Sequence, residues 1–181
     1  DEPFLIRTTE ELTKINNPFF ATIFTLSSHH PYEIPKKYES TFEKGTLPIH
    51  KSIRYADHSL KIFFEQASTL PWFKNTLFVI TADHTATSDS PYYQNRQGMY
   101  SIPLLFFMPA DNLQGKNNKT CQQIDILPSI MGYLNYDSTY FAFGQNTFDK
   151  NRSGYAITYL NDTYQYIESN YTFITDYAGK N

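Results

Sequence analysis

Three apolar runs constrain the fold of this 181-residue chain more than any other feature of its sequence. They cover residues 19–26, 76–82 and 102–108, and their side chains follow neither a helical period nor a strict alternation. Runs of this kind are typical of strands in parallel sheets, where helices cover both faces. Pro103, near the start of the third run, indicates an edge strand or a strand that begins after the proline.

Helical patterns lie between and after these runs. Residues 5–15 have the spacing of an amphipathic helix, and residues 50–67 repeat apolar side chains at steps of three and four. Asp125 can cap a further short helix, because Pro128 is tolerated in a first helical turn.

The last part of the chain has a different pattern. Residues 156–160 and 163–167 lie on either side of Asn161–Asp162 and together predict a β-hairpin, and residues 171–174 predict a third antiparallel strand. This unit follows strands that alternate with helices, an order that is typical of an α/β domain.

The predicted fold class is therefore α/β, with a mostly parallel sheet flanked by helices and a small C-terminal antiparallel sheet. We expect residues 1–150 to form the α/β part and residues 151–181 to form an antiparallel hairpin extension of the same domain.

Composition excludes several classes of function. The formal net charge of −3 gives no electrostatic reason to expect nucleic acid or an anionic membrane surface as a partner. The single cysteine, Cys121, excludes an internal disulfide. No transmembrane stretch or signal peptide is predicted. Because the chain opens at Asp1 without a methionine, we expect it to be a piece of a longer protein.

Asp83 and His84 follow the second apolar run directly. In an open α/β sheet, ligands bind beyond the carboxyl ends of the strands. A carboxylate oxygen and a neutral imidazole nitrogen together suit zinc, manganese or a similar divalent ion. The alternative reading is a helix cap or a hydrogen bond that orients a neighbouring group.

His29 and His30 follow the first apolar run in the same way. Adjacent parallel strands would bring this loop next to Asp83 and His84 at one edge of the sheet. One of the two histidines should point away, because neighbouring side chains in an extended segment face opposite sides. A serine nucleophile beside His29 is disfavoured, because no acidic partner can be placed.

Five motifs occur in a fixed order along the chain. They are Leu-Ser-Ser-His-His-Pro-Tyr at 26–32, Tyr-Ala-Asp-His-Ser-Leu at 55–60, Phe-Val-Ile-Thr-Ala-Asp-His at 78–84, Ile-Pro-Leu at 102–104 and Gln-Ile-Asp-Ile-Leu-Pro-Ser at 123–129. In this order they resemble the carboxyl-terminal half of a sulfatase-like domain of the alkaline phosphatase superfamily. The resemblance spans roughly residues 19–149, and the most similar branch is the lipoteichoic acid synthase type, which are phosphoglycerol transferases.

This resemblance implies roles for three residues. Asp83 and His84 match the pair that ligates one divalent ion, with manganese expected first and magnesium, calcium or zinc as alternatives. His29 matches the histidine of a His-x-Pro loop that contacts the phosphoglycerol head group. The family's nucleophile and its remaining acidic metal ligand lie upstream of the matched motifs, so the resemblance assigns no catalytic residue to this chain.

The implied function is that of part of a metal-dependent phosphoglycerol transferase, or of a related phosphodiester-cleaving enzyme, acting on cell-envelope lipid or glycan. The expected partners are an anionic lipid head group or a glycan, and the missing amino-terminal half of the domain. The complete protein is expected to be anchored in a bacterial membrane and to lie at its extracytoplasmic face. This piece alone is expected to be soluble and inactive. The alternatives are part of a sulfatase, or a catalytically dead module that binds glycans through its tyrosines.

Overall fold

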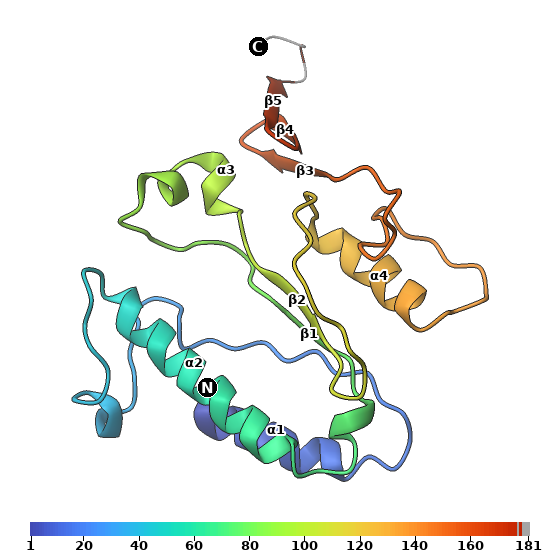
Figure 1. Cartoon of the computed structure of the whole chain (residues 1–181). Coiled ribbons are helices and arrows are strands. Elements are labelled where there is room, and N and C mark those ends of the chain that lie inside the picture. The colour runs from blue at the N-terminus through green and yellow to red at the C-terminus, as the bar shows by residue number, and fades with distance from the viewer. Residues whose placement is uncertain (177, 179–181) are drawn as a thin grey trace. The chain divides into compact units, whose positions relative to one another are not determined.

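The computed structural model describes residues 1–176 and 178 and has two compact units, Asp1–Leu113 and Gln114–Asn181 (Figure 1). The boundary at residue 113 does not coincide with the expected division at residue 150. Residues before 150 are hydrogen-bonded to the C-terminal hairpin: the Ile157 amide donates to Gln122 Oε1 at 3.0 Å, and Arg152 Nη1 donates to the Thr120 carbonyl at 2.8 Å.

The first unit contains three α-helices, two strands and three short 3-10 helices in the described chain. In order they are α1 (Glu2–Thr13), η1 (Lys36–Tyr38), α2 (Ile49–Ala67), η2 (Phe73–Asn75), β1 (Phe78–Thr81), η3 (Pro91–Gln94), α3 (Arg96–Met99) and β2 (Leu104–Phe107). The two long helices predicted from apolar spacing are confirmed, and α1 begins three residues earlier than expected.

The core of this unit lies where α1 packs on α2. Leu5 is 2% exposed, Phe63 is 4% exposed and Ala67 is fully buried. Trp72 packs against the same cluster, and its Nε1 donates a hydrogen bond to Thr13 Oγ1 at 3.0 Å. The apolar stripes of two amphipathic helices thus supply the main buried contact of the unit.

The α/β class is confirmed, and the strands of the described residues pair antiparallel, so the expected parallel pairing is not formed between them. β1 and β2 pair antiparallel, with Phe78 opposite Phe107 and Thr81 opposite Leu104. The chain leaves β1, forms the segment that contains α3, and returns along β1 in the opposite direction (Figure 1). β2 begins directly after Pro103, as the proline indicated.

The strand predicted at residues 19–26 is not formed among the described residues. In this segment Ile23 packs toward the core, whereas Phe20 is 86% and Phe24 is 71% exposed. A strand requires a hydrogen-bonded neighbour. β1 pairs with β2 alone, so apolar sequence does not suffice to make this segment a strand.

The second unit contains the small antiparallel sheet that the sequence predicts. Its elements in order are η4 (Gln123–Asp125), α4 (Ile126–Tyr133), β3 (Tyr155–Leu160), β4 (Thr163–Glu168) and β5 (Tyr171–Asp176). The strand order is β3-β4-β5. Asn161 and Asp162 have φ values of 50° and 58°, the left-handed conformation that a two-residue hairpin turn requires at both positions.

Asp125 is 1% exposed and occupies the predicted N-cap position of α4, but its side chain makes no cap hydrogen bond to that helix. Its Oδ2 accepts a hydrogen bond from the Gln122 amide at 3.0 Å, and its Oδ1 accepts one from the Gln145 amide at 2.8 Å. The carboxylate instead binds backbone on both sides of the helix in sequence, including an amide twenty residues away.

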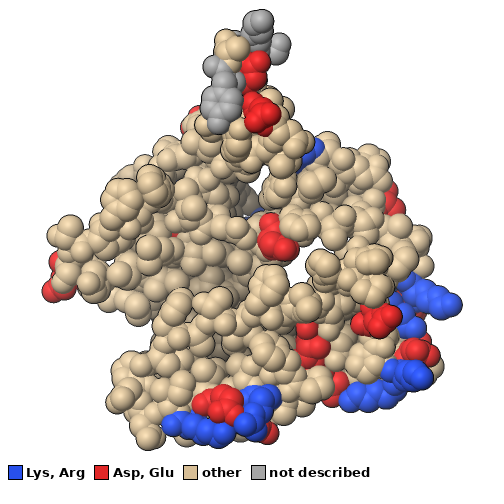
Figure 2. Space-filling model, turned by 180° about the vertical axis from the view of Figure 1, so that it is seen from behind, with Lys and Arg blue, Asp and Glu red and all other residues tan. Residues whose placement is uncertain are grey.

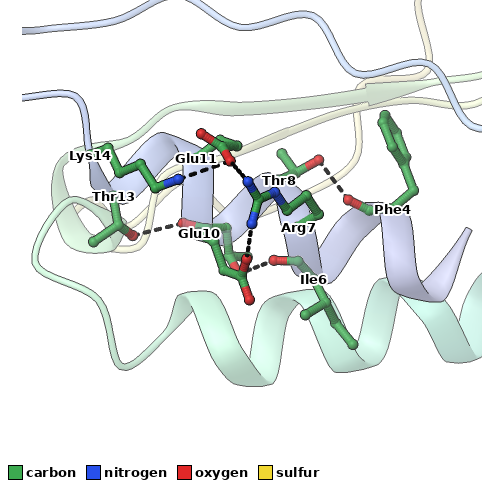
Figure 3. Close-up of polar contacts among 9 residues, drawn as sticks. Phe4, Ile6, Arg7, Thr8, Glu10, Glu11, Thr13 and Lys14 are labelled. Carbon is green, nitrogen blue, oxygen red and sulfur yellow. Dashed lines mark hydrogen bonds and ion pairs between the residues drawn. The ribbon is translucent and has the colours of Figure 1, made fainter.

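Several charged side chains at the surface lie beside opposite charges. On the face drawn in Figure 2, Lys and Arg side chains gather toward the lower end, next to Asp and Glu side chains. Figure 3 shows such a group on α1, where Arg7 contacts Glu10 and Glu11, and Lys14 contacts Glu11 at 2.9 Å. Exposed pairs of this kind contribute little to stability. In the described residues, no helix is long and apolar enough to cross a membrane.

Candidate functional site

Asp83 and His84 lie just beyond the end of β1, on backbone that is held from both sides. Thr81 Oγ1 donates a hydrogen bond to the Pro103 carbonyl at 2.9 Å, which fastens the end of β1 to the start of β2. The Thr85 amide donates to the Met99 carbonyl at 2.8 Å, which closes the base of the loop that follows. The backbone that carries Asp83 and His84 is therefore held in place at the end of β1.

The two side chains lie close to each other and are open to solvent. His84 Nε2 is 3.6 Å from Asp83 Oδ2, and their side chains are 48% and 63% exposed. The other carboxylate oxygen of Asp83 accepts the His84 backbone amide at 2.8 Å. One oxygen and one nitrogen thus face a common space, and this donor set fits a divalent ion such as manganese or zinc.

The loop after the pair is shaped by tight local packing. Asn95 Oδ1 accepts the Gly98 amide at 2.9 Å, which caps α3. A Cβ atom on Gly98 would lie 1.8 Å from the Tyr92 carbonyl oxygen, so only glycine fits there. These contacts give the chain between β1 and β2 a defined course on one side of the candidate site.

A contact across the unit also holds this loop. Thr46 Oγ1 donates a short hydrogen bond to Asp89 Oδ2, and this bond is the main cause that lowers the pKa of the Asp89 carboxyl. Thr46 and Asp89 are 43 positions apart, and no local sequence pattern marks either residue. The sequence alone therefore does not indicate this pair.

His29 lies in an exposed turn after the extended segment. Its amide donates to the Leu26 carbonyl at 3.0 Å, and the Tyr32 amide donates to the His29 carbonyl at 2.9 Å. His29 Nδ1 lies 2.8 Å from the His30 carbonyl oxygen. A carbonyl can only accept, so Nδ1 carries the proton and, in the neutral imidazole, Nε2 is the acceptor nitrogen. His29 is thus set to offer Nε2 to a donor group.

The predicted residues form one close pair and one separate loop. Within residues 1–176 and 178, no group of three or more His, Cys, Asp and Glu side chains is placed to hold a metal ion. His29 therefore does not complete a three-residue set with Asp83 and His84. Ile23 and Phe78 lie in the segments that lead to the two loops. Both side chains pack on the same core cluster, so both segments are held by the same part of the unit.

A comparison with protein families identifies the domain. The family model described as Sulfatase matches residues 1–136, which is most of the chain. This chain belongs to the sulfatase family. The match includes His29, Asp83 and His84 and ends just after α4.

Individual proteins of known sequence or structure agree with this family. The sulfatase-family chain is 26% identical over 170 residues to lipoteichoic acid synthase 1 of Bacillus subtilis, covering 83% of the chain and 26% of that protein. It is 24% identical over 156 residues to lipoteichoic acid synthase of Staphylococcus aureus, covering 76% of the chain and 24% of that protein. The chain thus spans about a quarter of the length of these relatives.

A solved structure confirms the fold. The crystal structure of an alkaline phosphatase superfamily protein from Vibrio parahaemolyticus matches this sulfatase-family chain with a TM-score of 0.83 and 22% identity. The match covers 99% of the chain and 45% of the other protein. At this identity the likeness concerns the fold alone, and it extends over both compact units.

Proposed function

We propose that this chain is the metal-binding part of a phosphoglycerol transferase of the lipoteichoic acid synthase type. The observation that carries the proposal is the Asp83–His84 pair, whose side-chain oxygen and nitrogen lie 3.6 Å apart at the end of β1. The similarity to lipoteichoic acid synthases supports the transferase branch. The substrate class that follows is an anionic glycerophospholipid head group of the cell envelope, with a lipid or glycan as acceptor.

The role proposed for Asp83 and His84 is to hold one divalent ion, with manganese as the expected metal. When bound, such an ion lowers the pKa of the attacking hydroxyl and neutralises charge on the transferred group. The exposure of both side chains supports this role, since the metal must remain open to substrate and to further ligands.

The role proposed for His29 is to bind the phosphoglycerol head group. With Nδ1–H donated to the His30 carbonyl, Nε2 can accept a hydrogen bond from a glycerol hydroxyl. After protonation, the same nitrogen can donate to a phosphate oxygen. In either state the side chain orients the head group and takes no part in bond breaking.

The nucleophile and the remaining acidic ligand are proposed to belong to the rest of the domain. The chain covers 45% of the alkaline phosphatase superfamily structure that it matches, and the described residues offer the metal two ligands. On this proposal the chain has no turnover by itself, and the complete enzyme works at the outer face of a bacterial membrane. Metal-dependent hydrolysis of a phosphodiester by these 181 residues would contradict the proposal.

The test uses the complete protein that contains this chain, assayed with manganese and phosphatidylglycerol as donor. Asp83→Ala and His84→Ala should each lower the transfer rate at least about 100-fold, because a lost ligand removes several kcal/mol of charge stabilisation. His29→Ala should mainly raise KM. His30→Ala is the matched control, since it removes a neighbouring exposed histidine that the proposal leaves without a role.

The same assay separates the transferase from the other candidates. Full rates in both Asp83→Ala and His84→Ala would remove the pair from the site. Cleavage of an aryl sulfate, with phosphatidylglycerol left intact, would show a sulfatase. Binding of a cell-wall glycan without either reaction would show a module without catalysis.

A further inference from the structure

Asp1 binds the backbone at the point where the His29 turn begins. Its Oδ1 accepts hydrogen bonds from the Leu26 amide at 2.9 Å and from the Ser27 amide at 3.1 Å. These residues are 25 and 26 positions away in sequence, so the contact ties the start of α1 to the end of the extended segment.

The Asp1 side chain does not make the hydrogen bond that is usual for an aspartate at its position. Asp1 is the N-cap residue of α1, where an aspartate usually accepts an amide of its own helix. Here the side chain makes no cap hydrogen bond. Its carboxylate instead satisfies two amides of another segment, which otherwise have no strand partner in the described chain.

The anchor is held in place by the buried part of the unit. The Tyr55 hydroxyl on α2 accepts the Glu2 amide at 3.2 Å, and Tyr55 is 2% exposed. The backbone nitrogen of Asp1 also lies 2.8 Å from Ser27 Oγ. The carboxylate therefore projects from a position that the packing of α1 on α2 fixes.

A short turn connects the anchored residues to the imidazole. The His29 amide binds the Leu26 carbonyl at 3.0 Å, so fixing residues 26 and 27 also fixes the backbone of His29. The bond from Nδ1 to the His30 carbonyl then sets the ring. These two hydrogen bonds connect the residues that Asp1 anchors to the orientation of the His29 ring.

We propose that Asp1 is a positioning residue for His29. It holds the turn from the α1 side, so that the imidazole is ordered before a head group binds. This role rests on the proposed function of His29 as a head-group ligand, but the positioning itself depends only on the contacts of the first unit. Asp1 does not touch the substrate.

The first experiment measures order in the 181-residue chain. In Asp1→Ala, the amides of Leu26, Ser27 and His29 should exchange with solvent at least about tenfold faster, and the ring signals of His29 should broaden or move. Asp1→Asn keeps an oxygen that can accept both amides and should restore most of the protection. Glu11→Ala, which removes an exposed carboxylate elsewhere on α1, should leave these amides unchanged.

Two results would overturn the proposal. One is unchanged exchange and unchanged His29 signals in Asp1→Ala. The other is an equal loss of protection in Glu11→Ala, which would show that any change on α1 loosens the turn and that the Asp1 contact is not specific.

A second measurement separates this proposal from the proposed function. Glycerol 1-phosphate is titrated into the chain and its binding is measured by calorimetry, which works equally for variants that lack the His29 ring. Asp1→Ala should weaken binding roughly tenfold, because the ligand must then also order the loop. Binding that is insensitive to both His29→Ala and Asp1→Ala, with the exchange result intact, would refute the head-group role and leave the positioning standing. Binding lost in His29→Ala but unaffected by Asp1→Ala would overturn the positioning.

Discussion

Asp125 shows how one buried carboxylate can join distant parts of the second unit. It accepts amides from residues 122 and 145, and its own carbonyl accepts the Ser129 hydroxyl at 2.6 Å. The Ser129 oxygen in turn accepts the Thr147 amide at 2.9 Å. The start of α4 and the segment at 145–147 are thus held by one connected set of hydrogen bonds.

Replacing Asp125 by alanine should destabilise the second unit strongly. The substitution leaves two amides without their acceptor in a site that is 1% exposed, and we expect a loss of about 2–4 kcal/mol. Urea unfolding followed by tyrosine fluorescence measures the loss. Asp137→Ala, at an exposed position in the same unit, should change stability by less than about 0.5 kcal/mol. Equal stability of the two variants would show that the hydrogen bonds of Asp125 do not contribute to the free energy of unfolding.

Glu2 should make the first unit sensitive to acid. Burial raises the pKa of this carboxyl, but hydrogen bonds from Lys37 and Tyr38, with the charges of Lys37 and His58, together outweigh burial and lower the pKa overall. A lowered folded pKa stabilises the fold above the unfolded value of about 4.3. That stability is lost as the pH falls through the lower, folded value.

Glu2→Gln should therefore flatten the acid side of the stability curve and cost about 1 kcal/mol at pH 7. Thermal unfolding between neutral and acidic pH measures both effects. Glu33→Gln changes an exposed carboxylate of the same unit and serves as the control. A Glu2→Gln curve parallel to that of the original protein would exclude Glu2 as the acid-sensitive group.

At this scale, the sequence indicates contacts between neighbouring residues but not between distant ones. Asp83 and His84 could be paired because they are adjacent and follow an apolar run. The contacts of Asp1 and Asp125 join residues about twenty or more positions apart. A helix cap was the only local use that the sequence suggested for Asp125, and its partners become visible only once the chain is folded.

At the level of elements, α1 and α2 were predictable because helices satisfy their backbone hydrogen bonds internally. Their apolar periods also identify the faces that meet. The segment at 19–26 was not predictable in the same way, because a strand depends on a neighbour that its own sequence does not specify. The direction in which β2 pairs with β1 depends likewise on the path of the chain between them.

The contact of α1 with α2 should dominate the stability of the first unit. Phe63→Ala empties a position that is 4% exposed beside Leu5, and we expect a loss of about 3–5 kcal/mol. Ile53→Ala on the same helix is 48% exposed and should cost roughly 1 kcal/mol or less. Chemical unfolding followed by circular dichroism distinguishes the two. Similar losses would place the main core of the unit elsewhere.

At the level of the whole molecule, the order of motifs predicted the family, which the match over residues 1–136 confirms. It did not predict that the compact units divide near residue 113. Motifs report shared ancestry of a fold, whereas compactness depends on which segments hydrogen-bond and pack together. Hydrogen bonds from Arg152 and Ile157 to residues 120 and 122 connect residues on either side of position 150, and no motif includes them.

The place of Trp72 makes the chain convenient for spectroscopy. It is the single tryptophan, and its indole packs against the core of the first unit. The second unit holds tyrosines and no tryptophan. Emission excited selectively in the indole band therefore reports the first unit alone, including any change at the Thr13 hydrogen bond. Loss of structure confined to residues 114–181 should leave that emission unaltered while the tyrosine signal changes.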